Sequence, residues 1–136
     1  MKKILIVSGD PNSINSEIIY KSWIKLPKSI KKKIYIISNY NLLKEQFKIL
    51  NYSINILKVK SIFESAKSFD LKLIDIDMKF NNPFDVSKKV ASNFVLKSLN
   101  MAHKLALNKN VAGIVNCAIN KNLLIKNKIG VTEYLA

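Results

Sequence analysis

The sequence predicts an α/β fold with a mostly parallel sheet, because short runs rich in β-branched residues alternate with stretches of helical periodicity. Its 136 residues suffice for one ordinary domain and leave little room for a second core. A hydrophobic content of 49% excludes a disordered chain, because that much apolar surface can offset the entropy lost on folding. We therefore expect residues 1–136 to form a single α/β segment.

The first half of the chain contains three apolar runs that end at turn residues, and helical patterns lie between them. Asn15 or Ser16 can cap the first helix, because both side chains accept hydrogen bonds from the first turn. The predicted strands are residues 3–7, 34–37 and 54–59, and the predicted helices run to about residue 26 and over residues 42–50.

The second half follows the same alternation less regularly. Residues 71–76 predict a strand in an excursion or edge region, and an Asn-Asn-Pro break follows at residues 81–83. The longest helix is predicted over residues 87–108, where apolar residues recur at spacings of three and four. Residues 111–115 predict a final buried strand, so residues 116–121 would lie at its carboxyl end, where open α/β sheets bind ligands.

The net charge of +14 comes from 23 lysines and no arginine. Arginine supplies the bidentate contacts that read guanine and grip phosphate, so its absence argues against specific nucleic-acid recognition. The lysines are spread along the chain and form a run only at residues 31–33, which favours genome composition over a lysine-rich nucleic-acid binder.

The apolar runs are far shorter than the ~20 residues that span a bilayer, so we expect no transmembrane helix. The start of the chain lacks the apolar core and cleavage site of a secretory signal, which predicts a cytoplasmic protein. Cys117 is the only cysteine, so one chain can form no internal disulfide.

Two positions with phosphate-binding chemistry each have a plainer interpretation. The segment Gly9, Asp10 and Pro11 is a tight turn or a phosphate-facing loop, and it lacks the glycines of a dinucleotide fingerprint. Lys121 follows the last strand and is either a phosphate contact or one more surface lysine.

Three further candidates for the functional site are of residue types that bind metals or act as nucleophiles. His103 lies within the longest helix without a second histidine, which favours a surface or half-buried side chain. Cys117 has no base beside it and is interpreted as a small buried residue. Asp75 and Asp77 are spaced to share one strand face, where they would hold a cation or form a solvated edge.

Three segments, in order, carry a family resemblance. Residues 8–18, SGDPNSINSEI, resemble the GDPAGIGPEI motif of the 4-hydroxythreonine-4-phosphate dehydrogenases, the PdxA family. Residues 116–121, NCAINK, are similar to the family's TAPINK segment, and residues 130–136, GVTEYLA, to its GHTEYLA segment. The resemblance covers the whole chain and identifies it with the amino-terminal portion of a longer, two-domain enzyme.

The resemblance implies a three-layer α/β/α fold like that of isocitrate and isopropylmalate dehydrogenases, truncated here. It also implies an NAD-dependent oxidation of a secondary hydroxyl, followed by decarboxylation, in pyridoxal phosphate (vitamin B6) biosynthesis. The substrate would be a small phosphorylated hydroxy amino acid, and the enzyme a cytoplasmic homodimer. A divalent metal, zinc, magnesium or cobalt, would be held by three downstream histidines that this chain does not contain, so we expect the fragment to be inactive alone.

The resemblance assigns substrate binding to Thr132 and, at the family's histidine position, to the substituted Val131. It places Gly9, Asp10, Pro11, Asn120 and Lys121 on the loop or phosphate side of the site, and it identifies no catalytic residue in this chain. Two alternatives stay open: a dehydrogenase of the same family that acts on another phosphorylated hydroxy acid, and a flavodoxin-like binding domain without catalysis.

Overall fold

The computed structural model of the chain describes residues 2–66 and 70–117. The strands are β1 (Lys3–Val7), β2 (Ile34–Ser38), β3 (Ile56–Val59), β4 (Leu71–Asp75) and β5 (Val111–Asn116). The helices are α1 (Asn15–Trp23), α2 (Lys28–Lys31), α3 (Tyr40–Ile49) and α4 (Lys88–Ala106). Every strand and helix expected within the described residues is present, and only the short α2 was not predicted.

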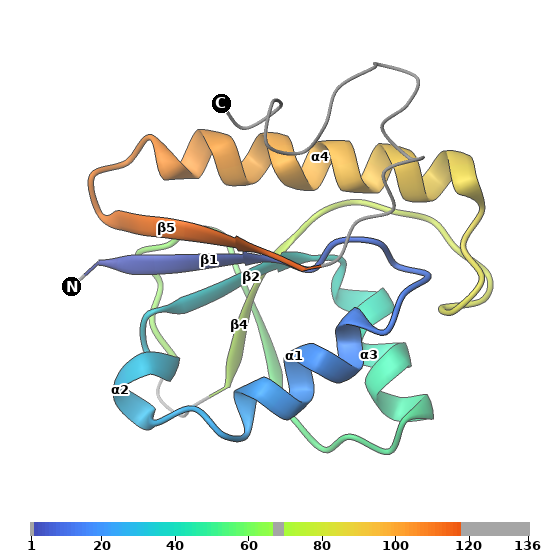
Figure 1. Cartoon of the computed structure of the whole chain (residues 1–136), viewed down its shortest axis with the longest axis horizontal. Helices are drawn as coiled ribbons and strands as arrows, with labels where there is room; N and C mark the ends of the chain where they lie inside the picture. The colour runs from blue at the N-terminus through green and yellow to red at the C-terminus, as the bar shows by residue number, and fades with distance from the viewer. Residues whose placement is uncertain (1, 67–69, 118–136) are drawn as a thin grey trace.

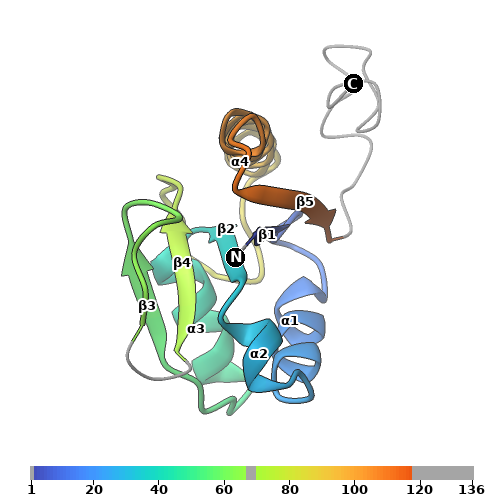
Figure 2. The same cartoon turned by 90° about the vertical axis from the view of Figure 1, so that its left-hand side faces the viewer.

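The five strands form one parallel sheet in the order β3-β4-β2-β1-β5. Helix α4 covers one face of this sheet, while α1, α2 and α3 lie on the other face (Figures 1 and 2). This arrangement confirms the three-layer α/β/α fold. None of the helices in the described part of the chain is long and apolar enough to cross a membrane.

Two apolar cores separate the three layers, because alternate residues of a strand face opposite sides of the sheet. Tyr35 and Ile37 of β2 belong to the core under α4, together with Phe94 of that helix. Ile34 and Ile36 belong to the other core, which α1 and α3 cover. All five residues of β2 are therefore buried, as expected for the middle strand of a parallel sheet.

Two predictions about the sheet are wrong. Strand β4 was expected in an edge region, but it pairs with both β2 and β3 and is buried from Leu71 to Ile74. Strand β5 was expected to be buried, but it pairs with β1 alone, and Val115 is 52% exposed. An apolar run reports that a strand is in a sheet, whereas its place in the strand order depends on contacts that sequence periodicity does not encode.

The start of α1 also differs from the prediction. Ile14 occupies the N-cap position and makes no side-chain capping bond, while Asn15 and Ser16 lie inside the helix and are buried. The Asn15 side-chain amide instead donates a 2.9 Å hydrogen bond to the carbonyl oxygen of Ser8. Asn15 thereby fixes the loop between β1 and α1 rather than the first turn of the helix.

Candidate functional site

The loop from Ser8 to Ile14 leaves β1 at the carboxyl edge of the sheet, the usual position of ligand sites in open α/β folds. Gly9 has a φ of 77°, a left-handed conformation that glycine adopts without steric cost. The Asp10 carboxylate accepts a 2.9 Å hydrogen bond from the N–H of Asn12, and Ser13 Oγ donates to the Asp10 carbonyl oxygen at 2.7 Å. The segment Gly9, Asp10 and Pro11 is thus a turn closed by its own side chains.

None of the asparagines and serines of this loop has the positive φ that would call for glycine. Within the described residues only Gly9 and Asn51 have positive φ, so Asn12, Ser13 and Asn15 all adopt conformations open to any residue. Gly9 is therefore the one position in this loop where the backbone conformation favours glycine.

Two long-range contacts attach the loop to the rest of the molecule. The Asn12 side chain donates to the carbonyl oxygen of Val86 at 2.8 Å and accepts from the Val86 N–H at 2.7 Å. Gln46 of α3 is buried, and its Nε2 donates to the carbonyl oxygens of Pro11 at 2.9 Å and of Pro83 at 2.8 Å. These bonds hold the loop against α3 and against the segment that precedes α4.

Three buried serines lie at the start of the loop, in the first turn of α1 and at the end of β2. The hydroxyls of Ser8, Ser16 and Ser38 are buried, and none has a hydrogen-bond partner within the described residues. Buried hydroxyls normally have partners, so this edge of the sheet retains unused hydrogen-bonding capacity. The amino terminus of α1 adds a partial positive charge at the same place.

Strand β5 ends beside this loop. Asn116 is its last residue, and the N–H of Cys117 donates to the carbonyl oxygen of Val7 at 3.0 Å. Cys117 is half-buried rather than buried as expected, and partial burial raises the pKa of its thiol, which keeps the thiol protonated and a poor nucleophile. The remaining expected site residues, Asn120, Lys121, Val131 and Thr132, lie outside the described residues.

The candidate metal ligands His103, Asp75 and Asp77 do not form a metal-binding group in the described residues. His103 is exposed in the last turn of α4. Asp75 ends β4, where its carboxylate accepts a 2.7 Å hydrogen bond from the N–H of Tyr40, and Asp77 lies beyond the strand. Both aspartates are exposed, with the buried Ile76 between them, which agrees with the solvated edge rather than with a cation site. Residues 2–66 and 70–117 contain no group of three histidine, cysteine or acidic side chains that would hold a metal.

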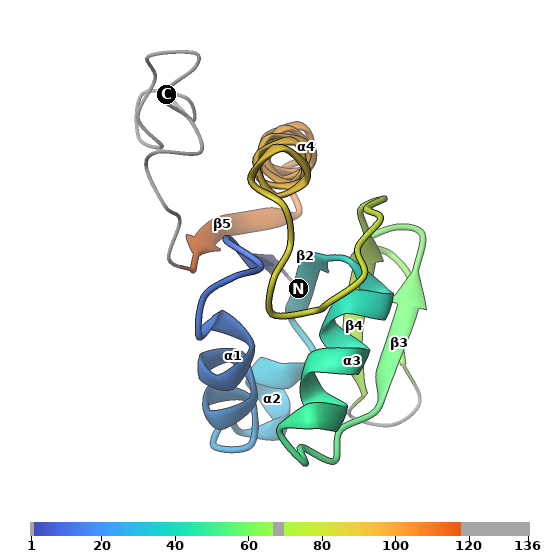
Figure 3. The same ribbon diagram turned by 90° about the vertical axis from the view of Figure 1, so that its right-hand side faces the viewer.

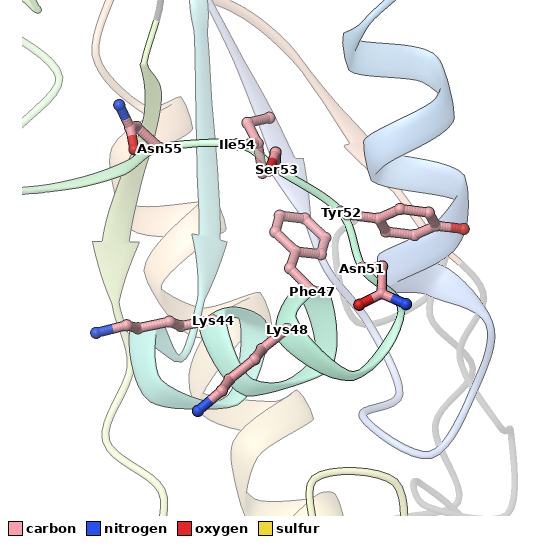
Figure 4. Close-up of a pocket in the computed structure, with 8 residues that line it drawn as sticks. All are labelled: Lys44, Phe47, Lys48, Asn51, Tyr52, Ser53, Ile54 and Asn55. Atoms are coloured by element: carbon pink, nitrogen blue, oxygen red, sulfur yellow. The ribbon is translucent and has the colours of Figure 1, made fainter.

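An open recess of about 750 Å³ lies at the other end of α3, away from the loop (Figure 4). It is bordered by the end of the helix and the segment after it, through Lys44, Phe47, Lys48, Asn51, Tyr52, Ser53, Ile54 and Asn55. Tyr52 stacks on Tyr20 of α1 with a centroid separation of 3.9 Å. The aromatic side of the recess is therefore part of the packing between α1 and the end of α3. We assign this recess no role in the candidate site.

Sequence reasoning missed two of the side chains that fix the loop, Asn12 and Gln46. The sequence did contain a signal for Gln46, because this residue follows Leu42 by four residues and Leu43 by three on the apolar stripe of α3. A glutamine on a buried stripe requires hydrogen-bond partners, and those partners are the two proline carbonyls. Asn12 carried no comparable signal, because asparagine is ordinary in a turn.

Comparison with known proteins gives a consistent result. A family model described as pyridoxal phosphate biosynthetic protein PdxA matches residues 29–136. The 4-hydroxythreonine-4-phosphate dehydrogenase of Sulfurihydrogenibium sp. (strain YO3AOP1) is 32% identical over 142 residues, which cover all of this chain and 42% of that protein. The chain thus spans about two fifths of the length of this relative.

Solved structures show the same fold. A 4-hydroxythreonine-4-phosphate dehydrogenase from Burkholderia phymatum superposes with a TM-score of 0.85 at 21% identity, covering all of this chain and 43% of that one. A candidate enzyme of the same name from Salmonella typhimurium gives 0.82 at 25% identity and is covered to 44%. Because the family model spans residues 29–136, which is most of the sequence, the chain belongs to the PdxA family.

Proposed function

We propose that this chain is the amino-terminal part of an NAD-dependent 4-hydroxythreonine-4-phosphate dehydrogenase. The observation that supports the proposal most strongly is the Sulfurihydrogenibium relative of that name, which matches the chain over its full length. The fixed loop at the carboxyl edge of the sheet adds a structural reason, because it forms a hydrogen-bonded turn at a position where such folds bind ligands. The whole enzyme would be a cytoplasmic homodimer.

The proposed reaction has two steps. The carbon that bears the secondary hydroxyl loses a hydride and the hydroxyl releases its proton to water, which gives a ketone β to the carboxylate. The β-keto acid then loses carbon dioxide, and the resulting enolate takes up a proton from water. NAD, when bound, would supply the acceptor for the hydride.

The chain's own contribution to this site is binding and orientation. The loop of Gly9, Asp10 and Pro11 forms one wall, held in place by Asn12 and Gln46. Thr132 contacts the substrate in this proposal, and Asn120 and Lys121 lie on its phosphate side. The chain has one histidine, the exposed His103, so it does not fit a three-histidine metal site, and we derive no step through the metal here.

A second substrate is favoured by one substitution. Val131 stands where the family pattern has a histidine, and valine neither donates a hydrogen bond nor titrates. A phosphorylated hydroxy acid that needs no hydrogen bond at this position would then be the better substrate. The ratio of kcat/KM for another phosphorylated hydroxy acid to that for 4-phosphohydroxythreonine separates the two cases: a ratio above one in the enzyme with Val131, lowered by Val131→His, supports the second substrate.

The test uses a chimera in which residues 1–136 replace the matching segment of the Sulfurihydrogenibium relative. With NAD, a divalent metal and 4-phosphohydroxythreonine, we expect the chimera to form NADH and the 136-residue chain alone to form none. The unaltered relative is the positive control. A folded chimera that stays silent with every phosphorylated hydroxy acid, beside an active relative, would overturn the proposal.

A further inference from the structure

The recess at the carboxyl end of α3 is shaped by the way in which this helix ends. Asn51 has a φ of 59°, the left-handed conformation that commonly terminates a helix. The N–H of Tyr52 then donates to the carbonyl oxygen of Phe47 at 2.8 Å, and the N–H of Asn51 donates to that of Lys48 at 3.2 Å. These two bonds form a Schellman motif, which fixes the segment after α3 against the last turn of the helix. The recess is therefore defined by hydrogen-bonded backbone.

The lining of the recess combines apolar and polar groups (Figure 4). Phe47 is 2% exposed, and Tyr52 and Ile54 are half-buried. Three exposed residues whose side chains can donate hydrogen bonds also line it: Asn51, Ser53 and Asn55. Its volume of about 750 Å³ lies within the roughly 300–1,000 Å³ of small-molecule sites. The recess can therefore hold a small molecule with one apolar and one polar part.

Two lysines line the recess, and a third shares an aromatic contact with one of them. Lys44 and Lys48 are four residues apart on α3, so their side chains leave the same side of the helix (Figure 4). Lys58 belongs to β3, the strand beside α3 (Figure 3). The ammoniums of Lys44 and Lys58 lie 5.7 Å and 5.2 Å from the centroid of the same ring, that of Tyr40. We call Lys44, Lys48 and Lys58 the α3 lysine cluster.

No acidic side chain forms an ion pair with this cluster within the described residues. The ion pair found there joins Lys21 and Glu17 of α1 at 2.7 Å. Asp75 uses its carboxylate to accept a hydrogen bond from the Tyr40 N–H. Glu45, the acidic residue of α3, has no lysine within ion-pair distance. The positive charge of the cluster is thus left without a paired anion in this part of the chain.

The end of α3 itself disfavours an anion, because its carbonyl groups carry a partial negative charge. Lys48 lies in the last turn and offsets that charge, so Lys44 and Lys58 supply the excess positive charge. Like charges at a spacing of four residues repel each other on a helix. An anion beside the helix would be attracted to each ammonium and would also reduce this repulsion.

We propose that the recess and the α3 lysine cluster bind a small organic phosphate, with its phosphate at the lysines and its organic part against the apolar lining. Lysine binds phosphate as a compact point charge, whereas the chain has no arginine for bidentate recognition of a carboxylate. The loop after β1 contacts α3 through Gln46, which does not line the recess. The site is therefore separate from the candidate site, and the inference does not rest on the proposed function.

The test titrates the 136-residue chain with phenyl phosphate and follows the chemical shifts of the backbone amides. A salt concentration of about 0.15 M screens non-specific attraction to the positively charged chain. We expect saturable binding with the largest shift changes at residues 44–58. Inorganic phosphate should bind at least about threefold more weakly, because it lacks the ring that contacts the apolar lining.

Substitutions of single lysines locate the phosphate. Lys44→Gln and Lys58→Gln should each weaken the binding of phenyl phosphate by about two- to fivefold, as the loss of one exposed charge pair would. The double variant should lose about tenfold. Lys97→Gln removes the same charge from an exposed position on α4, across the sheet, and is the matched control, which should bind as the parent does.

Three results would overturn the proposal: phenyl phosphate binding that does not saturate, equal weakening by Lys97→Gln and Lys44→Gln, and equal affinity for phenyl phosphate and inorganic phosphate. The first two would reduce the cluster to part of the general positive charge, and the third would remove the organic part of the ligand. Saturable binding of hexaglutamate at residues 44–58, without saturable binding of phenyl phosphate, would assign the cluster to an acidic peptide instead.

Discussion

The side-chain amide of Asn12 forms two hydrogen bonds with the backbone of Val86, donating to its carbonyl oxygen at 2.8 Å and accepting from its N–H at 2.7 Å. The two residues are 74 positions apart, so the pair joins the loop after β1 to the segment before α4. It makes the shape of the candidate site depend on two distant parts of the chain.

Asn12→Asp tests this pair. The substitution keeps the acceptor for the Val86 N–H but places an oxygen against the Val86 carbonyl, so we expect a loss of about 1–2 kcal/mol in the free energy of unfolding. Urea denaturation measures the loss. Asn93→Asp, on the exposed side of α4, is the control and should change stability by less than about 0.5 kcal/mol. Equal effects of the two substitutions would show that the pair contributes nothing specific.

Gln46→Glu tests the second attachment of the loop. The new carboxylate would be buried against the carbonyl oxygens of Pro11 and Pro83, which costs about 2–4 kcal/mol at pH 7. Burial raises the pKa of such a carboxyl group, so the folded state binds the extra proton more tightly than the unfolded state. The loss should therefore shrink as pH falls toward 5.

Thermal denaturation at pH 5 and pH 7 measures this dependence on pH. Glu45→Gln, the reverse change at the neighbouring and less buried position, is the matched control. A Gln46→Glu variant that is equally stable at both pH values, relative to the parent, would contradict the account of the two carbonyl contacts.

Lys72 should make the free energy of unfolding rise with pH. Its ammonium lies 4.1 Å from the Tyr35 ring centroid and donates to the carbonyl oxygen of Lys32 at 2.6 Å. Burial and the nearby charge of Lys3 lower its pKa to about 8, below the ordinary 10.5. Between these values the unfolded chain binds more protons than the folded one, so the free energy of unfolding rises with pH.

From pH 7 to pH 9 we expect a gain of about 1 kcal/mol at most from this group, after allowance for water near the ammonium. Comparison with Lys72→Met cancels the opposing effect of Cys117, whose raised pKa lowers stability at alkaline pH. If the parent and Lys72→Met respond equally to pH, the lysine is not the source of the rise.

Leu99→Ala tests the core between α4 and the sheet. Leu99 is fully buried beneath that helix, so its truncation should leave a cavity and cost about 2–5 kcal/mol. Leu107→Ala removes the same atoms just after α4, where the side chain is 77% exposed, and should cost less than about 0.5 kcal/mol. Denaturant midpoints for the two variants give the comparison directly.

The fold was largely readable from the sequence because its parallel strands are buried on both faces and appear as short β-branched runs. The order of the strands was not, since Leu71–Asp75 and Val111–Asn116 carry similar local patterns although one strand is internal and the other lies at the edge. The buried Lys72 illustrates the same limit, because its position depends on Tyr35 and on the carbonyl of Lys32, both distant in sequence.

The candidate site was located by its position after β1 and by family resemblance, but its construction was not foreseen. Asn15 suggested a helix cap from residue type alone, whereas the structure directs its amide to the Ser8 carbonyl. The residue type determines which hydrogen bonds a side chain can form, and the fold determines which partner lies within reach. The roles of Asn120, Lys121, Val131 and Thr132 stay predictions.

The most direct measurement is the amount of NADH and of carbon dioxide released by the chimera from 4-phosphohydroxythreonine labelled at its carboxyl carbon. If the chain belongs to a dehydrogenase that oxidises the hydroxyl and then decarboxylates the product, the two should form in equal amounts and both should require NAD. Labelled carbon dioxide without NADH, or neither product beside an active parent enzyme, would contradict the account.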